Sequence, residues 1–304
     1  MNHLVIGIPT YKRPIMLRKC LNSIIENQID AGLLGEIDIL VVDNDVELSA
    51  KEVVFDIQSN VKKPFCIQYN PMSDKGLSRV RNEILTKAIN LDSDFIIFID
   101  DDEFASKMWL NELIEKAVNL KADMVLGRVI PVFEKEINEG LRYWFKYPNF
   151  RDGISIDFLI THNLIIRSQF IIDNALSFDL RFNITGGEDS FFGIQALNKG
   201  AKVFFARYAL VYETIPEKKS NLKWLIKRYF RVASTFIHVL KLEKKYILLF
   251  KKFLVSIVYL IMGIPALFLL FFPIKFKFWG IIKISESIGG FAGIININYQ
   301  EYKN

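Results

Sequence analysis

Short apolar runs alternate with apolar residues at helical spacing over the first 130 residues. The runs predict strands, and the spaced residues between them predict helices. The expected strands lie at residues 4–8, 37–42, 65–69, 95–99 and 124–130, and the expected helices at residues 17–25, 77–88 and 107–120. Strands alternating with helices are typical of a mainly parallel sheet that helices cover on both faces. We therefore predict an α/β fold.

Polar residues stand at or just after the ends of three of these strands. They are Thr10, Asp43 and Asp100. In open α/β sheets, ligands bind outside the carboxyl ends of the strands. The three residues therefore predict one binding site at one edge of the sheet.

Residues 131–215 follow a less regular pattern. Residues 157–167 predict a strand that contains His162. Residues 186–189 read Gly-Gly-Glu-Asp and precede a short helix that we expect to end at Gly200. We place a catalytic domain at residues 1–215.

Long helices are predicted after Pro216. Apolar residues from 222 to 240 recur at spacings of three and four, which places them on one helix face. Residues 253–273 then carry no charge, and the stretch is long enough to cross a bilayer. We place a second, α-helical region at residues 216–304, made of a basic amphipathic helix and apolar membrane-associating helices.

The uncharged stretch could form a transmembrane helix, a re-entrant hairpin or a buried helix pair. Lysines flank it on both sides, at residues 251, 252, 275 and 277, and such charges prefer the cytoplasmic side. Gly263 and Pro265 near its middle favour a bend or a reversal. We therefore favour a monotopic or peripheral C-terminus on the cytoplasmic face of the cell (inner) membrane over a single span or a soluble packing surface.

The distribution of charge supports this interpretation. The 304 residues carry a net charge of +5, and residues 218–252 hold eleven Lys or Arg against one acid, Glu243. Such a segment attracts an anionic surface, and the apolar sequence after it favours lipid over nucleic acid. Cys20 and Cys66 match no zinc or redox spacing. No secretory signal precedes the first strand, so we expect the catalytic part in the cytoplasm.

Four consecutive acids at residues 100–103 follow the apolar run at 95–99. Their like charges repel one another and are costly to bury. A divalent cation that carries an anionic ligand would offset that cost, and carboxylate oxygens suit Mg²⁺ or Mn²⁺. The alternative is an acidic cap for the helix at 107–120, for which one acid would suffice.

Five segments in order resemble the family-2 glycosyltransferases with the GT-A fold. Residues 5–14 (VIGIPTYKRP) are similar to the family's opening strand and loop, and residues 41–44 (VVDN) to its second-strand nucleotide motif. Residues 76–82 (GLSRVRN) match its Gly-x-Ser-x-x-Arg-Asn helix, residues 100–102 its DxD motif, and residues 186–189 its acceptor-side GGED signature. The resemblance spans about residues 4–231, and bacterial exopolysaccharide transferases are the most similar subgroup.

The resemblance implies a donor site for a nucleoside diphosphate sugar. Thr10 and Asp43 would contact its base and ribose, and Lys75 and Arg81 would lie near its ribose or phosphates. Within the DxD motif, Asp100 would face the ribose, Asp101 the donor sugar, and Asp102 would bind the metal.

The resemblance also implies an acceptor side. Asp189 matches the catalytic base that takes a proton from the acceptor hydroxyl, and Glu188 beside it would bind an acceptor hydroxyl. Trp224, Arg228 and Arg231 resemble a pattern that follows the GT-A domain in the subgroup. Either arginine could reach a diphosphate of donor or lipid carrier, or the helix could simply be a solvated or lipid-facing basic helix.

One position departs from the family pattern. Many relatives carry a His where this chain has Tyr212, and some use it as a metal ligand. A tyrosine is a poor ligand for Mg²⁺ or Mn²⁺ at neutral pH, which leaves any third protein ligand open. We expect His162 to be a structural residue or a sugar contact.

These features predict an inverting glycosyltransferase. It would move a single sugar from a nucleotide-diphosphate sugar, most simply a UDP-sugar, to a saccharide acceptor linked to polyprenyl diphosphate, in bacterial surface polysaccharide synthesis. The expected partners are the nucleotide sugar donor, the lipid-linked acceptor and the membrane surface, with no nucleic acid. A dehydrogenase is disfavoured because no Gly-x-Gly-x-x-Gly follows the first strand. The alternative is a non-catalytic membrane-associated sugar-binding or scaffold protein on a GT-A fold.

Overall fold

The computed structural model describes residues 1–183, 185–268 and 274–297. The chain forms two compact units. The first contains Met1–Pro131, Tyr147–Asn183 and Glu188–Thr214, and the second contains Val132–Lys146, Ile184–Gly187 and Ile215–Asn304. The second unit thus draws two segments from within the range that we assigned to the catalytic domain.

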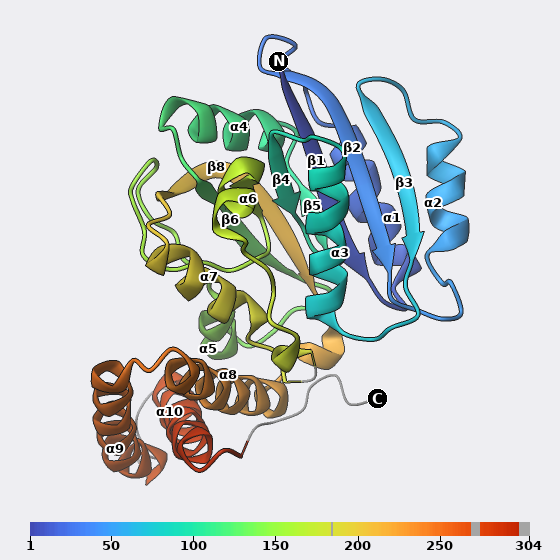
Figure 1. Cartoon of the computed structure of the whole chain (residues 1–304). Coiled ribbons are helices and arrows are strands. Elements are labelled where there is room, and N and C mark those ends of the chain that lie inside the picture. The colour runs from blue at the N-terminus through green and yellow to red at the C-terminus, as the bar shows by residue number, and fades with distance from the viewer. Residues whose placement is uncertain (184, 269–273, 298–304) are drawn as a thin grey trace. The chain divides into compact units, whose positions relative to one another are not determined.

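One eight-stranded sheet organises the first unit, in the order β3-β2-β1-β4-β7-β6-β8-β5. Four neighbouring strands, β3, β2, β1 and β4, are parallel, whereas β7 runs antiparallel to β4 and β6, and β5 runs antiparallel to β8. The sheet is therefore mixed and mainly parallel, which confirms the predicted α/β fold with a mainly parallel sheet (Figure 1). The strands are β1 (Asn2–Thr10), β2 (Leu34–Asp43), β3 (Phe65–Pro71), β4 (Phe95–Phe98), β5 (Glu103–Ala105), β6 (Met124–Phe133), β7 (Leu164–Arg167) and β8 (Val203–Ile215).

Helices cover both faces of this sheet because successive strand residues point to opposite sides. In β1, Leu4, Ile6 and Ile8 belong to the core under α1, α2 and α4, while Val5 belongs to the core under α3, α6 and α7. The helices are α1 (Pro14–Ile25), α2 (Lys51–Gln58), α3 (Leu77–Asn90), α4 (Trp109–Asn119), α6 (Ser168–Asn174) and α7 (Glu188–Asn198). Helix α3 approaches the sheet so closely that a Cβ on Gly7 of β1 would lie 2.2 Å from Cγ2 of Ile84.

The predicted strand at 157–167 is wrong for its first seven residues. Only Leu164–Arg167 pairs in the sheet, as β7. Asn163 directly precedes β7, and its φ of 51° lies in the left-handed region, so the extended strand does not continue through it toward residue 157. Its buried side chain donates to the carbonyls of Arg128 (3.0 Å) and Ala209 (2.9 Å). It also accepts a 2.7 Å hydrogen bond from Nε1 of Trp109.

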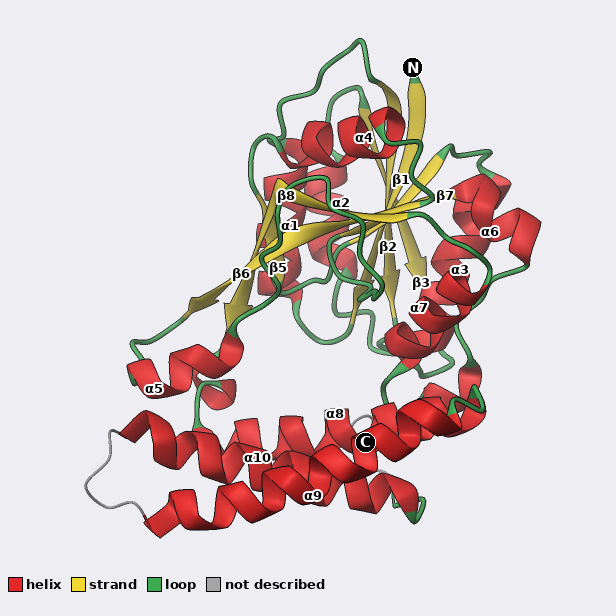
Figure 2. Ribbon diagram, turned by 90° about the vertical axis from the view of Figure 1, so that its left-hand side faces the viewer, coloured by secondary structure: helices red, strands yellow, loops and turns green. Residues whose placement is uncertain are grey.

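Helices dominate the second unit. They are α5 (Glu139–Arg142), α8 (Leu222–Leu242), α9 (Tyr246–Phe268) and α10 (Ile274–Ile294). Figure 2 shows the three long helices side by side, and α10 packs along both α8 and α9. Helix α9 continues through Gly263 and Pro265, so the predicted reversal there is wrong. Residues 269–273, the end of the predicted uncharged stretch, lie outside the described residues.

Glycines allow the long helices to approach closely. A Cβ on Gly280 of α10 would lie 2.9 Å from the carbonyl oxygen of Gly263 in α9. A Cβ on Gly289 would lie 2.2 Å from the carbonyl oxygen of Phe230 in α8. Lys241 of α8 also donates a 2.9 Å hydrogen bond to the carbonyl of Gly293 near the end of α10. The helices are therefore joined by backbone contacts as well as by side chains.

Candidate active site at the carboxyl ends of the strands

Thr10 and the acid stretch meet at the edge of the sheet, as the strand ends predicted. The Thr10 hydroxyl donates a 2.9 Å hydrogen bond to Asp101, and both residues are buried. They are adjacent because β1 and β4 are parallel neighbours, with Gly7 opposite Phe98. Asp100 and Asp101 therefore follow β4 at the level where β1 ends.

Arg13 neutralises part of the acid stretch. One terminal nitrogen of its guanidinium lies 2.8 Å from Oδ1 of Asp101 and 2.9 Å from Oδ2 of Asp102. Burial raises the pKa of Asp101 to about 6 although Arg13 and Thr10 act to lower it. The side chain of Arg13 is 41% exposed, whereas those of the two aspartates are 5% and 9% exposed. A cation is thus stabilised between these two carboxylates. We assigned no role to Arg13 from the sequence, although it stands in the same loop as Thr10.

Asp43 is buried at the end of β2 and organises the loop that follows. One of its oxygens accepts the N–H of Asp45 at 3.0 Å, and the other accepts the N–H of Ala50 at 3.0 Å and the hydroxyl of Tyr69 at 2.9 Å. Asp45 is buried beside it, and its Oδ2 has no hydrogen-bond partner among the described residues. The role of Asp43 in binding a base or ribose stays a prediction. Its observed partners show that it also fixes the shape of this edge.

Glu103, the last acid of the stretch, pairs with His162. Its Oε1 lies 2.9 Å from Nδ1 of His162, and its Oε2 accepts the N–H of Asp100 at 2.9 Å. Burial acts to lower the pKa of His162, but the carboxylate of Glu103 outweighs it and raises the pKa to about 9. The ring of Tyr147 packs against His162 with 5.2 Å between centroids. The imidazolium of His162 therefore offsets the negative charge of Glu103, one of the four acids in the stretch.

Tyr212 lies away from the Glu103–His162 pair. It faces Phe104 across the β5–β8 ladder, and the two rings stack with centroids 5.1 Å apart. Glu213, the next residue of β8, is the one that stands opposite Glu103. Among the residues that the structure describes, no three His, Cys, Asp or Glu side chains form a group that could hold a metal ion. Asp102 as a metal ligand stays a prediction.

Arg81 joins the acid stretch to the Gly-Gly-Glu-Asp segment. Its guanidinium lies 3.7 Å from Asp100 and forms a hydrogen-bonded ion pair with Glu188. Burial raises the pKa of Glu188, Arg81 acts to lower it, and Asp189 acts to raise it. Glu188 is 4% exposed, and a carboxylate that is buried to this extent needs a paired cation. Arg81 is that cation.

Asp189 occupies the first turn of α7. Its carboxylate is half-buried and accepts the N–H of Ser190 at 2.6 Å. Gly186 and Gly187, whose φ angles of 73° and 96° lie in the left-handed region, directly precede the helix. The helix then ends before Gly200, which has a φ of 84°, as predicted.

The remaining predicted residues carry exposed or half-buried charges. The Lys75 ammonium lies 5.9 Å from the ring centroid of Tyr11, in the loop that follows β1. In the second unit, Arg228 lies over the ring of Trp224 at 5.2 Å, and Arg231 stands one turn later on α8. Their contacts with a diphosphate stay predictions.

Comparison with known proteins assigns the family. The model of glycosyl transferase family 2 matches residues 5–174. The succinoglycan biosynthesis protein ExoM of Rhizobium meliloti (strain 1021) is 32% identical over 242 residues, which cover 77% of this chain and 74% of that protein.

Solved structures support the fold. TarS of S. aureus (residues 1–349) in complex with UDP-GlcNAc superposes with a TM-score of 0.56 at 17% identity, covering 76% of this chain and 66% of that one. The same protein in complex with UDP superposes with a TM-score of 0.56 at 14% identity, covering 96% and 91%. At these identities the likeness shows a common GT-A fold alone. The family match and the relative go further, and together they show that the chain belongs to glycosyl transferase family 2.

Proposed function

We propose that this glycosyltransferase moves one sugar from a UDP-sugar to a saccharide carried on a polyprenyl diphosphate, with inversion, in bacterial surface polysaccharide synthesis. The observation that carries the proposal is the placement of Arg81 between Asp100 and Glu188. It brings the predicted donor-side and acceptor-side acids into one charge network. The TarS complexes with UDP and UDP-GlcNAc support a donor of this class.

A divalent cation fits the acid stretch. Arg13 shows that positive charge is stabilised between Asp101 and Asp102, and carboxylate oxygens suit Mg²⁺ or Mn²⁺. Asp102 is the protein ligand in this proposal, and diphosphate oxygens and water would complete the shell. When bound, the cation supplies Lewis-acid stabilisation of the charge that develops on the departing diphosphate.

Asp189 is the base in the proposed reaction. Its half-buried carboxylate takes the proton of the acceptor hydroxyl while that oxygen bonds to the anomeric carbon of the donor. The bond from this carbon to the diphosphate breaks on the opposite side, so the configuration inverts. Beside Asp189, Glu188 is held by its ion pair with Arg81, which acts to lower the pKa of Glu188 against the effect of burial.

The second unit supports a membrane-bound acceptor. Within the described residues, one helix is long and apolar enough to cross a membrane, over Tyr246–Leu267, with a mean hydropathy of 2.2 and 11% of it buried. Its exposed apolar side chains include Ile247, Phe250 and Ile261. We propose that this surface enters the cytoplasmic leaflet and holds the enzyme where lipid-linked saccharides are found.

The test is release of the nucleoside diphosphate by the full chain with Mn²⁺ or Mg²⁺ and a panel of nucleotide sugars. Release that requires a lipid-linked acceptor, with a product of inverted configuration by NMR, supports the proposal. Asp189→Asn should reduce turnover by about 10²-fold or more while donor binding persists, because the proton acceptor is lost. Tight donor binding without release for any acceptor would contradict it and favour a sugar-binding scaffold.

A further inference from the structure

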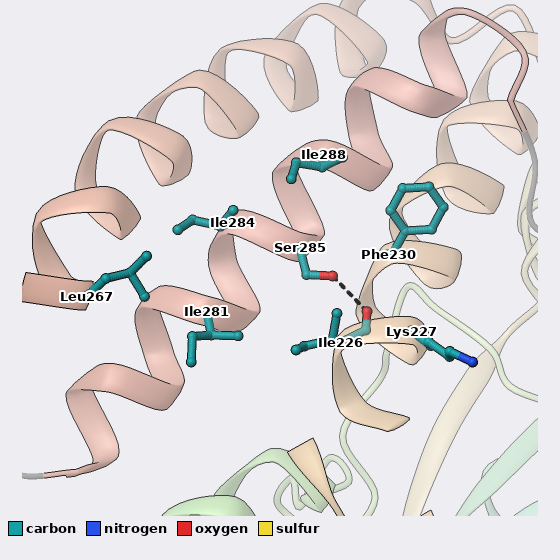
Figure 3. Close-up of a pocket in the computed structure, with 8 residues that line it drawn as sticks. All are labelled: Ile226, Lys227, Phe230, Leu267, Ile281, Ile284, Ser285 and Ile288. Atoms are coloured by element: carbon teal, nitrogen blue, oxygen red, sulfur yellow. Dashed lines mark hydrogen bonds between the residues drawn. The ribbon is translucent and has the colours of Figure 1, made fainter. Parts of the chain in front are cut away.

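An apolar pocket of about 360 Å³ lies within the second unit, between α8, α10 and the end of α9. Figure 3 shows the side chains that line it: Ile226, Lys227, Phe230, Leu267, Ile281, Ile284, Ser285 and Ile288. The Ser285 hydroxyl donates to the carbonyl of Ile226 at 2.7 Å, which satisfies both groups and pins α10 to α8. The lining therefore offers apolar contacts, and the hydroxyl of Ser285 is already hydrogen-bonded. A hydrocarbon is the class of ligand that suits such a lining.

The helices around the pocket show the pattern of a bundle that is immersed in lipid. Small and hydroxyl side chains occupy buried positions, among them Ser234, Ser256 and Ser287, while Ile247 and Ile261 of α9 are 78% and 65% exposed. A water-exposed bundle would place such apolar residues inside. Small residues at helix contacts with apolar residues outside are typical of membrane helices. The second unit therefore has the side-chain distribution of helices that contact hydrocarbon chains.

Positive charge stands at one side of the pocket. The stem of Lys227 lines it, while the ammonium group points away from the apolar side chains (Figure 3). Lys223 lies one turn earlier on α8, and both lysines are exposed. Within the described part of the chain, neither forms an ion pair with an acid. Two ammonium groups one turn apart match a diphosphate better than the single phosphate of a common phospholipid.

We propose that this pocket binds the phosphate-proximal isoprene units of the polyprenyl chain that carries the acceptor, with its diphosphate at Lys223 and Lys227. This rests on the proposed function and adds the residues that recognise the lipid. The volume is at the low end of the roughly 300–1,000 Å³ of small-molecule pockets, so only a short part of the chain enters. The methyl branches of an isoprenoid fill the space between the isoleucines, and the rest of the chain stays in the bilayer.

Photolabelling of the full chain in nanodiscs tests the proposal. The probe is a polyprenyl diphosphate with a diazirine in its first isoprene units, and labelled residues are mapped by mass spectrometry. Label on Phe230, Leu267 or Ile288 is expected.

Ile281→Trp, which fills the pocket, should reduce the label at least tenfold. It should also lower the ratio of turnover with lipid-linked acceptor to turnover with a water-soluble acceptor by about tenfold, since about two buried methylene groups are lost. Ile295→Trp, at a position 67% exposed just after α10, is the matched control and should change neither.

Three outcomes would overturn the assignment. The first is label only on the outer face of α9. The second is loss of label when phosphatidylglycerol is added in excess, which would show that a phospholipid acyl chain occupies the pocket. The third is equal labelling of Lys223→Gln/Lys227→Gln and the unchanged chain. Failure of the proposed function is a separate result: the pocket would still be labelled, but no acceptor would support sugar transfer. Mapping on the unchanged chain needs no variant, so a misfolded Ile281→Trp would leave the test intact.

Discussion

Arg13 holds two buried carboxylates together at the centre of the candidate site. Because Asp101 and Asp102 share one guanidinium nitrogen, removal of that group takes away the cation that the two carboxylates share. A metal ion that is bound by Asp102 would have to share or replace this contact. Arg13 and the metal are therefore expected to compete for the same oxygen.

Arg13→Ala should lower the free energy of unfolding by about 1–3 kcal/mol without metal, the cost of leaving a buried acceptor unsatisfied. It should also strengthen Mn²⁺ binding in the absence of nucleotide, because the competing cation is gone. Denaturant titration and electron paramagnetic resonance of free Mn²⁺ measure the two effects. Arg18→Ala, which removes an exposed pair with Asp56, is the control. Unchanged Mn²⁺ affinity in Arg13→Ala would argue against metal binding at Asp102.

The Arg81–Glu188 pair offers a second test at this scale. Both side chains are about 95% buried, so Arg81→Met should destabilise the fold by about 3–5 kcal/mol by leaving the carboxylate unpaired. Glu188→Gln in the Arg81→Met background should recover part of that loss. A double-mutant cycle by denaturant unfolding measures the coupling. Additive effects of the two substitutions would show that the pair does not act as a unit.

The sequence predicted some of these residues better than others. Thr10 and Asp100 were expected at one edge because each stands at the end of an apolar strand, and Thr10 donates a 2.9 Å hydrogen bond to Asp101, the residue next to Asp100. The pairing of Arg81 with Glu188 joins residues 107 positions apart, and no local pattern encodes such a distance. Glu103 and His162 likewise meet only after the sheet has formed.

The position of Tyr212 in strand β8 determines the direction of its side chain. Its stack on Phe104 is a consequence of the β5–β8 ladder, in which alternate residues face opposite sides. The three-residue strand β5 was not predicted, because it is short and polar at its first position. A family pattern that considers only position 212 therefore does not reveal Phe104, the residue against which the side chain packs.

Tyr212→His should leave Mn²⁺ affinity within about twofold of the unchanged chain, less than about 0.4 kcal/mol, because the imidazole would replace a stacked ring and not a ligand. Isothermal titration with Mn²⁺ and UDP measures it, and Tyr212→Phe is the control for loss of the hydroxyl. A tenfold gain in affinity in Tyr212→His alone would mean that this position reaches the metal.

Asn163 shows how one residue sets the position at which a strand begins. We expected residues 157–163 to be extended because apolar residues surround them, but the pattern of polarity does not reveal a left-handed backbone. Asn163→Ala should lower the free energy of unfolding by about 3 kcal/mol, since it removes three hydrogen bonds, two of them buried, and leaves Ala in a left-handed conformation. Denaturant unfolding measures the change. Asn174→Ala, which removes one local bond to Phe170, should cost about 1 kcal/mol or less, and an equal cost for both would contradict this account.

At the scale of the whole molecule, the two units differ in the environment that their surfaces suit. The first unit buries its apolar side chains on both faces of a sheet, whereas α9 of the second unit exposes many of its own. Hydropathy along the chain predicted the apolar stretch. It did not predict that α9 would remain one helix through Pro265, because a proline in a helix interior removes a backbone hydrogen bond and favours a bend or break.

Phe250→Glu combined with Ile261→Glu should reduce binding to vesicles that contain phosphatidylglycerol by tenfold or more, because each exposed apolar side chain contributes about 1.5–3 kcal/mol when buried in lipid. Both positions are at least 60% exposed, so the fold should persist. Flotation with vesicles measures binding, and circular dichroism checks the helices. Ile15→Glu, 85% exposed on α1 of the first unit, is the control. Equal flotation of all three proteins would rule out α9 as the membrane-binding surface.

The position of α9 late in the chain affects the order of events during synthesis. Strand β8, which pairs with β5, is complete at Ile215, and α9 begins only at Tyr246. At a synthesis rate of about 5–20 residues per second, the intervening residues delay the apolar helix by a few seconds. The sheet therefore has time to close its last strand pair before the ribosome releases a segment that attracts chaperones and lipid. Moving α9 ahead of β1 in a fusion would reverse this order and should increase aggregation of newly made chains.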